Sequence, residues 1–200
     1  VLSILEQKKL EHEASHRGDL CILLALYTGM RVGELCALRW SDIDLENRQL
    51  TVRHSVKRVR QSSGRTIASV SSPKTDCSLR DIPLPAAVVR MLRSMPQNSE
   101  FVFPGRHGHC MDTRTMQLRL RTITQHLGLR GVHMHTLRHT YATRCLEKQV
   151  GFETLSVLLG HSSPDITIKY YSHTTPEEKR RCVSRLKPLG IPSAGTCAVA

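Results

Sequence analysis

The stretch HTLRHTYATRCLEKQVGFETLSVLLGHSSPDITIKYYSH, residues 135–173, gathers histidines, arginines and tyrosines between well-marked helix ends. At its start His135 and Arg138 are three residues apart, so on a helix they project from one face. In its middle a short apolar run ends at Gly160, a residue type typical of helix C-termini, and His161 follows directly. The sequence thus predicts one helix with two polar donors on a single face, and a second helix that leaves a histidine just beyond its end.

A further helix start follows at Ser163-Pro164-Asp165, which supplies an N-cap residue, a proline at the first helical position and an acid in the first turn. Tyr170 and Tyr171 come about two turns later. Neighbouring residues on a helix point about 100° apart, so only one of the two tyrosines can face a given site.

Charge and composition indicate the class of partner. Lysine and arginine outnumber the acids 29 to 17, which gives a net charge of +12 and favours a polyanion. Aromatic residues make up only 4% of the chain, which argues against recognition of single-stranded bases by stacking. The backbone of double-stranded DNA is therefore the expected partner of this 200-residue chain, whose length suits one domain.

The seven cysteines lack paired spacing, and several lie inside apolar helical runs. This pattern is typical of thiols that fill a core in a reducing compartment, so we expect a cytoplasmic protein. The longest apolar run, Leu20 to Tyr27, is far shorter than a membrane span, and the N-terminus has no signal-peptide layout. No membrane contact is expected.

Hydrophobic periodicity and turn signals predict a mostly helical domain with a small antiparallel β-sheet, an α+β fold. The expected helices include residues 3–16, 20–28, 34–38, 86–93, 113–127 and about 175–186. The expected strands, in one sheet, are residues 50–53, 66–70 and 79–84.

Five short motifs occur in order between residues 20 and 186. They are Thr28-Gly-Met-Arg31-Val-Gly-Glu34-Leu, then Ser72-Pro-Lys74-Thr with Arg80-Asp-Ile-Pro-Leu-Pro85 after it, His135-Thr-Leu-Arg138-His, Leu159-Gly-His161, and Tyr171-Ser-His173. Together they resemble the catalytic domain of the tyrosine recombinases, the phage-integrase family. Whether the parent protein is a phage integrase, a conjugative-transposon integrase or a chromosomal recombinase stays open.

The resemblance implies a role for each motif residue. The implied catalytic residues are Arg31, Lys74, His135, Arg138, His161 and Tyr171. Arginine forks bind phosphate oxygens bidentately and stay charged. The lysine would protonate the departing 5′ oxygen, the histidines would position the phosphate and tune the loss of the tyrosine proton, and Glu34 would orient the arginine side. No cofactor and no metal is expected, because two guanidiniums neutralise the phosphate.

The choice of nucleophile rests on two competing counts. In many family members the tyrosine comes nine residues after the histidine of the LGH motif, which here selects Tyr170. In others it comes ten residues after, and in both groups it precedes a histidine by two, which selects Tyr171. We favour Tyr171, because a loop before the helix absorbs one inserted residue more easily than the helix itself does.

Basic residues outside the motifs are candidates for contacts with the DNA backbone. They are Arg53, Lys57, Arg58, Arg114, Arg119 and Arg121. A solvated edge or helix face is the alternative interpretation of such residues.

The resemblance also implies a domain plan. Residues 1–186 would form the catalytic domain, and residues 187–200 a tail that is flexible or docked on a neighbouring protomer. The chain starts almost at the first catalytic-domain helix, so we expect a fragment without the family's N-terminal core-binding domain. A dimer to tetramer is expected on DNA, and a monomer or weak association without it.

The implied activity is site-specific DNA recombination or integration through a 3′-phosphotyrosyl intermediate. Type IB topoisomerase-like relaxation of DNA and a non-catalytic DNA-binding regulator are the alternatives. A zinc module is a weaker one, because its candidate ligands do not have CxxC or HEXXH spacing. Those ligands are His107, His109, Cys110, His133, His135 and His139.

Overall fold

The computed structural model describes residues 1–60, 66–71, 79–105 and 108–161. The expectations for Lys74, Tyr170, Tyr171, the helix at about 175–186 and the tail therefore lie outside the described residues.

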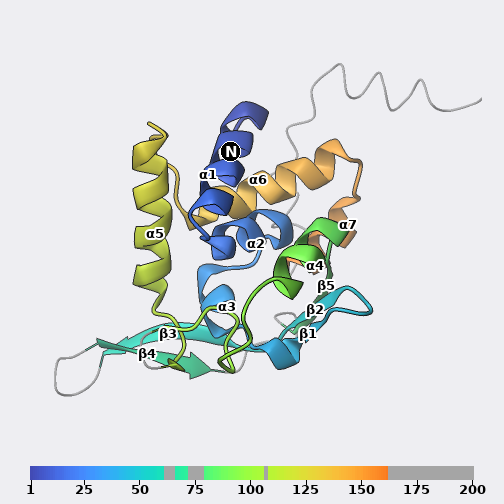
Figure 1. The fold of residues 1–200 in the computed structure, drawn as a ribbon. Coiled ribbons are helices and arrows are strands. Elements are labelled where there is room, and N and C mark those ends of the chain that lie inside the picture. Colours follow the sequence, from blue (N-terminus) through green and yellow to red (C-terminus); the bar gives the residue numbers. More distant parts are fainter. Residues whose placement is uncertain (61–65, 72–78, 106–107, 162–200) are drawn as a thin grey trace, which may run out of the picture.

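Helices form most of the described fold, and the strands lie along one side of them (Figure 1). The helices are α1 (Ile4–His16), α2 (Leu20–Thr28), α3 (Val32–Ala37), η1 (Trp40–Asp42), α4 (Ala86–Arg93), α5 (Thr113–His126), α6 (Met134–Glu147) and α7 (Phe152–Leu159). The strands are β1 (Ile43–Asp44), β2 (Gln49–Val52), β3 (Ser55–Arg60), β4 (Thr66–Ser71) and β5 (Arg80–Pro83). This arrangement confirms the predicted α+β class.

Helix α1 begins where its sequence predicts. The Ser3 hydroxyl accepts from the backbone N–H of Glu6 at 3.2 Å, and the Glu6 carboxylate accepts from the backbone N–H of Ser3 at 2.8 Å. This reciprocal pair satisfies two donors that a helix start otherwise leaves unpaired.

The apolar helix α2 forms the centre of the core. It contacts α1, α3, α4 and α6, and its residues Cys21, Ile22, Leu24 and Leu26 are buried. A helix that is apolar on all sides has to be covered on all sides, which explains this central position. Cys21 is a free thiol, as expected for a cysteine that fills a core.

The strands form two sheets instead of the single sheet expected. Antiparallel β1, β2 and β5 make one sheet in the order β1-β2-β5, and β3 pairs with β4 in the other. The chain leaves the first sheet at Arg53 and His54, which both lie close to the buried carboxylate of Asp42 at 3.5 Å and 3.9 Å. These contacts accompany the break that the sequence pattern did not reveal.

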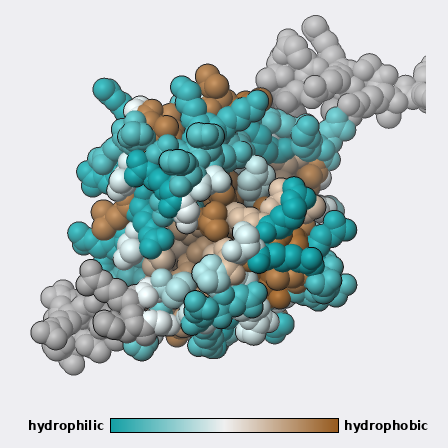
Figure 2. Space-filling model, in the orientation of Figure 1, coloured by the Kyte–Doolittle hydropathy of each residue, from teal (hydrophilic) through white to brown (hydrophobic). Residues whose placement is uncertain are grey.

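The viewed surface is mainly polar. Figure 2 shows hydrophilic side chains over most of one face, with hydrophobic ones in patches between them. Within the described ranges, no helix is both long enough and apolar enough to cross a membrane.

Candidate active site

The turn after α2 places Arg31 at the start of α3. Gly29 ends α2 with φ of +63°, a left-handed conformation that side chains disfavour. A Cβ atom at this position would also lie within 2.4 Å of the ring of Tyr141. Glycine is therefore required for both backbone conformation and space, and the tight turn carries the chain directly to Arg31.

Glu34 holds Arg31 at two points. Its carboxylate accepts from the backbone N–H of Arg31 at 2.8 Å and from Nη1 of the same residue at 2.9 Å. Glu34 is buried, whereas the Arg31 side chain is 38% exposed. The contact expected between Glu34 and the arginine side is thus present, and it leaves part of the Arg31 fork accessible.

Arg138 projects from α6 into the interior and bridges two chain segments. Its Nη1 donates to the carbonyl of Gly29 and its Nη2 to the carbonyl of Leu159, both at 2.7 Å. Charge-assisted bonds of this length fix the plane of the guanidinium. Arg138 therefore ties the turn after α2 to the end of α7.

The end of α7 is held by three arginines. Helix α7 stops at Gly160, which has φ of +65°, and its last carbonyls have no partner within the helix. Arg80 Nε donates to the carbonyl of Leu158 at 2.8 Å, Arg138 to that of Leu159, and Arg31 Nη2 to that of Gly160 at 3.0 Å. Three consecutive carbonyls thus each receive a guanidinium from a different part of the chain.

A cavity of about 230 Å³ opens beside these groups. Arg31, His135 and Arg138 line it together with residues of α3, β3 and the start of α5 and α6. A water molecule occupies roughly 30 Å³ in the liquid, so a phosphodiester group, the size of a few waters, fits this space. The structure therefore brings both predicted arginines and one predicted histidine to one hollow.

Burial and the nearby arginines lower the basicity of two histidines of the site. Burial, followed by the charges of Arg138 and Arg31, lowers the pKa of His161 to about 4. Burial and Arg138 also lower the pKa of His135. His161 is thus neutral near pH 7, and its pKa should rise when a bound anion offsets the nearby positive charge.

Arg80 is a component of the site that sequence reasoning missed. The resemblance includes it in the motif Arg80 to Pro85 without a role, yet its side chain is 2% exposed and its guanidinium binds Glu34. The signal was available, because Arg80 alternates with Ile82 and Leu84 and so falls on the buried face of the strand. An arginine on a buried face has to have a charged or polar partner.

Neither of the two described tyrosines lines the cavity beside Arg31. The Tyr27 hydroxyl donates to Glu11 at 3.0 Å, and burial and Glu11 raise its pKa to about 12. Burial also raises the pKa of Tyr141, whose ring packs against Gly29. Of the four tyrosines in the chain, Tyr170 and Tyr171 are the other two, and both lie outside the described residues, as does Lys74.

The six basic residues predicted to contact DNA are all exposed. Arg58 on β3 lies 3.8 Å from Asp112, the residue before α5, so β3 and the start of α5 share a surface with Arg114. Arg121 lies two turns along the same face of α5. Arg119 lies about 140° around the helix from Arg114 and forms an ion pair with Asp19 at 3.5 Å.

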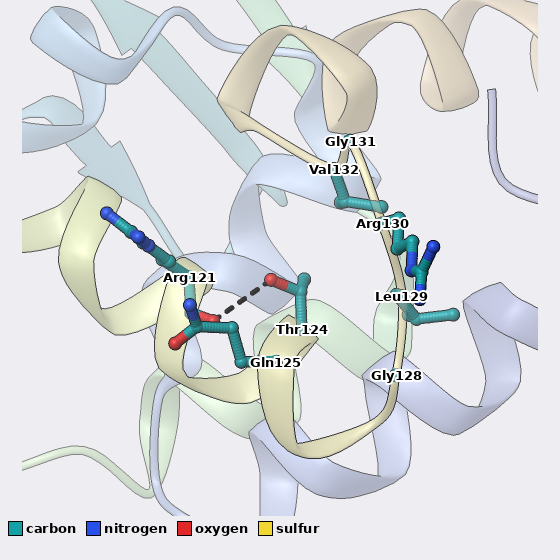
Figure 3. A pocket seen from close by; sticks show the side chains of 8 residues that line it. All are labelled: Arg121, Thr124, Gln125, Gly128, Leu129, Arg130, Gly131 and Val132. Atoms are coloured by element: carbon teal, nitrogen blue, oxygen red, sulfur yellow. Dashed lines mark hydrogen bonds between the residues drawn. The ribbon is translucent and has the colours of Figure 1, made fainter.

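A larger hollow of about 490 Å³ lies at the connection between α5 and α6. Figure 3 shows its two arginines, Arg121 and Arg130, on different sides and pointing away from one another. This hollow shares no lining residue with the cavity beside Arg31. It therefore lacks the converging charges that a phosphate site needs.

The candidate zinc ligands are not gathered in the part of the chain that the structure describes. No three histidine, cysteine or acidic side chains there are grouped as a metal ion would require. His133 and His135 are neighbours, with ring centroids 6.3 Å apart, and no third such group joins them within that part of the chain.

Known proteins resemble this chain along most of its length. The sequence pattern of the phage integrase family matches residues 1–178. A tyrosine recombinase XerC-like protein of Caldanaerobacter subterraneus subsp. tengcongensis is 32% identical over 88% of this chain and 50% of its own length. The integrase of Staphylococcus phage L54a is 26% identical over 93% of this chain and 56% of its own. The chain therefore spans about half the length of these relatives.

Solved structures share the fold. A Tn1549 transposon integrase in complex with circular intermediate DNA matches with a TM-score of 0.74 and 25% identity, over 94% of this chain and 66% of that one. XerA recombinase matches with a TM-score of 0.70 and 29% identity, over 94% and 63%. The family pattern covers most of the sequence and the folds agree, so the chain belongs to the phage integrase family.

Proposed function

We propose that this chain carries the catalytic centre of a site-specific DNA recombinase or integrase, which cleaves and rejoins duplex DNA through a tyrosine. The observation that carries the proposal is the convergence of Arg31, Arg138 and His135 on one cavity, with both guanidiniums held in place by Glu34 and backbone carbonyls. Preorganised donors of this kind stabilise the charge that develops on a phosphate during transfer.

In the proposed reaction the Tyr171 oxygen attacks the scissile phosphorus, and the bond from phosphorus to the 5′ oxygen breaks. The phenol proton leaves to a neutral acceptor such as His161, and Lys74 gives a proton to the departing 5′ oxygen. The product is a 3′-phosphotyrosyl bond and a free 5′-hydroxyl. Rejoining is the reverse step, so the exchange conserves bond energy and needs no nucleotide cofactor.

The exposed cations of β3 and α5 would hold the duplex by its phosphates. Arg58, Arg114 and Arg121 are the best placed of the six, because they share one side of the molecule. The Tn1549 relative was solved with DNA, and we propose that this chain likewise binds duplex DNA and assembles on it as a dimer to tetramer. The free buried thiols Cys21 and Cys36 support a cytoplasmic setting.

Covalent trapping tests the proposal without knowledge of the target sequence. The chain is incubated with a pool of nicked duplexes of random sequence, in which the fragment carrying the new 5′-hydroxyl diffuses away and the adduct accumulates. Wild-type protein and Tyr170→Phe should form the adduct, and Tyr171→Phe should bind DNA without forming it.

The outcomes of the trapping experiment distinguish the proposed recombinase from each alternative function. Adducts on a narrow set of sequences support a recombinase, whereas adducts spread evenly over the pool would point to topoisomerase-like relaxation. If wild-type protein binds DNA but forms no covalent adduct, a non-catalytic DNA-binding regulator would be the remaining alternative. Loss of the adduct in Tyr170→Phe but not in Tyr171→Phe would reverse the choice of nucleophile.

A further inference from the structure

Arg80 occupies the centre of a buried ion-pair network just outside the cavity. Its Nη1 lies 3.1 Å from one Glu34 oxygen and its Nη2 lies 2.8 Å from the other, a two-point fork-to-carboxylate contact. The side chains are 2% and 5% exposed. Arg80 does not line the cavity, so it cannot itself bind a phosphate there.

Glu34 transmits the position of Arg80 to Arg31. Each carboxylate oxygen of Glu34 is shared: Oε1 accepts from Arg80 and from Nη1 of Arg31, and Oε2 accepts from Arg80 and from the backbone N–H of Arg31. Burial by itself would raise the pKa of Glu34, but the hydrogen bond and charge of Arg80, with Arg31, keep it below its usual value. Arg80 therefore keeps the carboxylate both ionised and oriented.

Arg80 also fixes the last turn of α7. Its Nε donates to the carbonyl of Leu158, the first of the three consecutive carbonyls that accept from arginines. The third, the carbonyl of Gly160, accepts from Arg31. A Cβ atom at Gly160 would lie 2.8 Å from Arg80 Nη1, so the two residues are in close contact. Arg80 is thus linked to Arg31 by two routes, one through the Glu34 carboxylate and one through the last turn of α7.

We propose that Arg80 is a positioning residue for phosphoryl transfer, whose fork sets the orientation of Arg31 through Glu34 and the last turn of α7. The inference rests on the proposed function. A freely rotating Arg31, whose side chain is 38% exposed, would lose its alignment with the phosphate. A misplacement of about 1 Å costs on the order of 100-fold in rate. DNA affinity does not depend on this alignment, because many exposed cations contribute to it.

The test compares Arg80→Lys with wild-type protein on nicked duplexes taken from the trapping experiment. The substitution keeps the charge but removes the fork. We expect single-turnover cleavage to slow on the order of 100-fold, with the dissociation constant for DNA unchanged within about threefold. Arg93→Lys is the matched control, because Arg93 also pairs with a glutamate, Glu46, at 2.7 Å but on the exposed surface. It should cleave at the wild-type rate.

The pH profile separates positioning from a purely structural role. In Arg80→Gln the carboxyl of Glu34 loses the partner that lowers its pKa most, so its pKa should be higher than in wild-type protein. The cleavage rate of this variant should then rise with pH, because ionised Glu34 can again bind and orient Arg31. Arg80→Gln combined with Glu34→Gln should stay slow at every pH. Wild-type rate and profile in Arg80→Lys, or no added pH dependence in a folded Arg80→Gln, would overturn the inference.

A measurement without DNA separates this inference from the proposed function. In wild-type protein the Arg31 guanidinium N–H signals should exchange slowly with water, because Glu34 and Gly160 hold them, and in Arg80→Lys they should exchange faster. If wild-type protein forms no adduct, the proposed function fails, and these signals still decide whether Arg80 positions Arg31. Equal exchange in the two proteins would refute the positioning role.

Discussion

The arginines of this protein occupy two contrasting environments. Arg80 and Arg138 are buried and bind carbonyls and a carboxylate at 2.7 to 3.1 Å. Arg53 and Arg58 are exposed, and their ion pairs with aspartates are loose, at 3.5 and 3.8 Å. The same side chain is therefore held by several partners in one region and is open to solvent in the other.

This difference assigns different tasks to the two regions. A fixed guanidinium pays its desolvation and ordering cost during folding, so it meets a phosphate already aligned. A mobile surface arginine attracts DNA over a distance set by salt, and adds affinity without fixing geometry. Arg31 lies between the two classes, because Glu34 holds it while 38% of its side chain stays open to a ligand.

The largest expected effect comes from breaking the buried ion pair. Arg80→Ala leaves the Glu34 carboxylate buried without its main partner, and this should cost about 3–5 kcal/mol in the free energy of unfolding. Urea unfolding measures it. Arg93→Ala breaks an exposed pair of similar distance and should cost less than about 1 kcal/mol. Equal losses in the two variants would contradict the division into buried and exposed arginines.

The next effect concerns catalysis by Arg31. Arg31→Lys keeps one positive charge but loses the planar fork, so cleavage should fall about 100- to 1000-fold while DNA binding changes little. Single-turnover cleavage and a binding titration measure the two quantities. Arg53→Lys, the same substitution on the surface, should leave the cleavage rate unchanged. A comparable loss of rate in both variants would mean that Arg31 contributes only charge.

A smaller effect is expected for the surface cations. Arg58→Gln and Arg114→Gln should each reduce the slope of log affinity against log salt by about 1, with the cleavage rate at saturating DNA unchanged. Arg119→Gln should change the slope less, because Arg119 faces another side of α5 and pairs with Asp19. A larger change for Arg119 than for Arg114 would place the DNA on the other side of this helix.

Local signals predicted much of this fold. The Ser3 capping box, the apolar α2 and the glycines at positions 29 and 160 mark helix ends through contacts within a few residues. The split into two sheets was not predicted, because alternation along the chain shows which residues share a face of a strand and not which strands pair. In the structure β2 pairs with β1 and β5, whereas β3 pairs with β4.

The site shows the same division between local and distant information. The motifs predicted Arg31, His135 and Arg138 as site residues, and in the structure these three side chains line one cavity. It did not identify the partners of Arg80, which are Glu34, 46 residues away in sequence, and Leu158, 78 residues away. An arginine on the buried face of a predicted strand indicates that a polar or charged partner exists. Only the folded structure shows which residue that partner is.

The last expected effect is a pH dependence of stability that arises from His161. Its pKa in the folded protein is about 4, below the usual 6.5, so between these values the unfolded chain binds more protons than the folded one. Stability should therefore be fully present above about pH 6.5 and should fall as the pH drops toward 4. His161→Asn removes this contribution, so the variant should lose less stability than wild-type protein between pH 7 and pH 4, although His135 and His139 still contribute.

Thermal unfolding across this range measures the difference, with His12→Asn, a substitution at an exposed histidine, as control. If the two variants follow the same curve, burial and the arginine cluster do not lower the pKa of His161 in the folded protein.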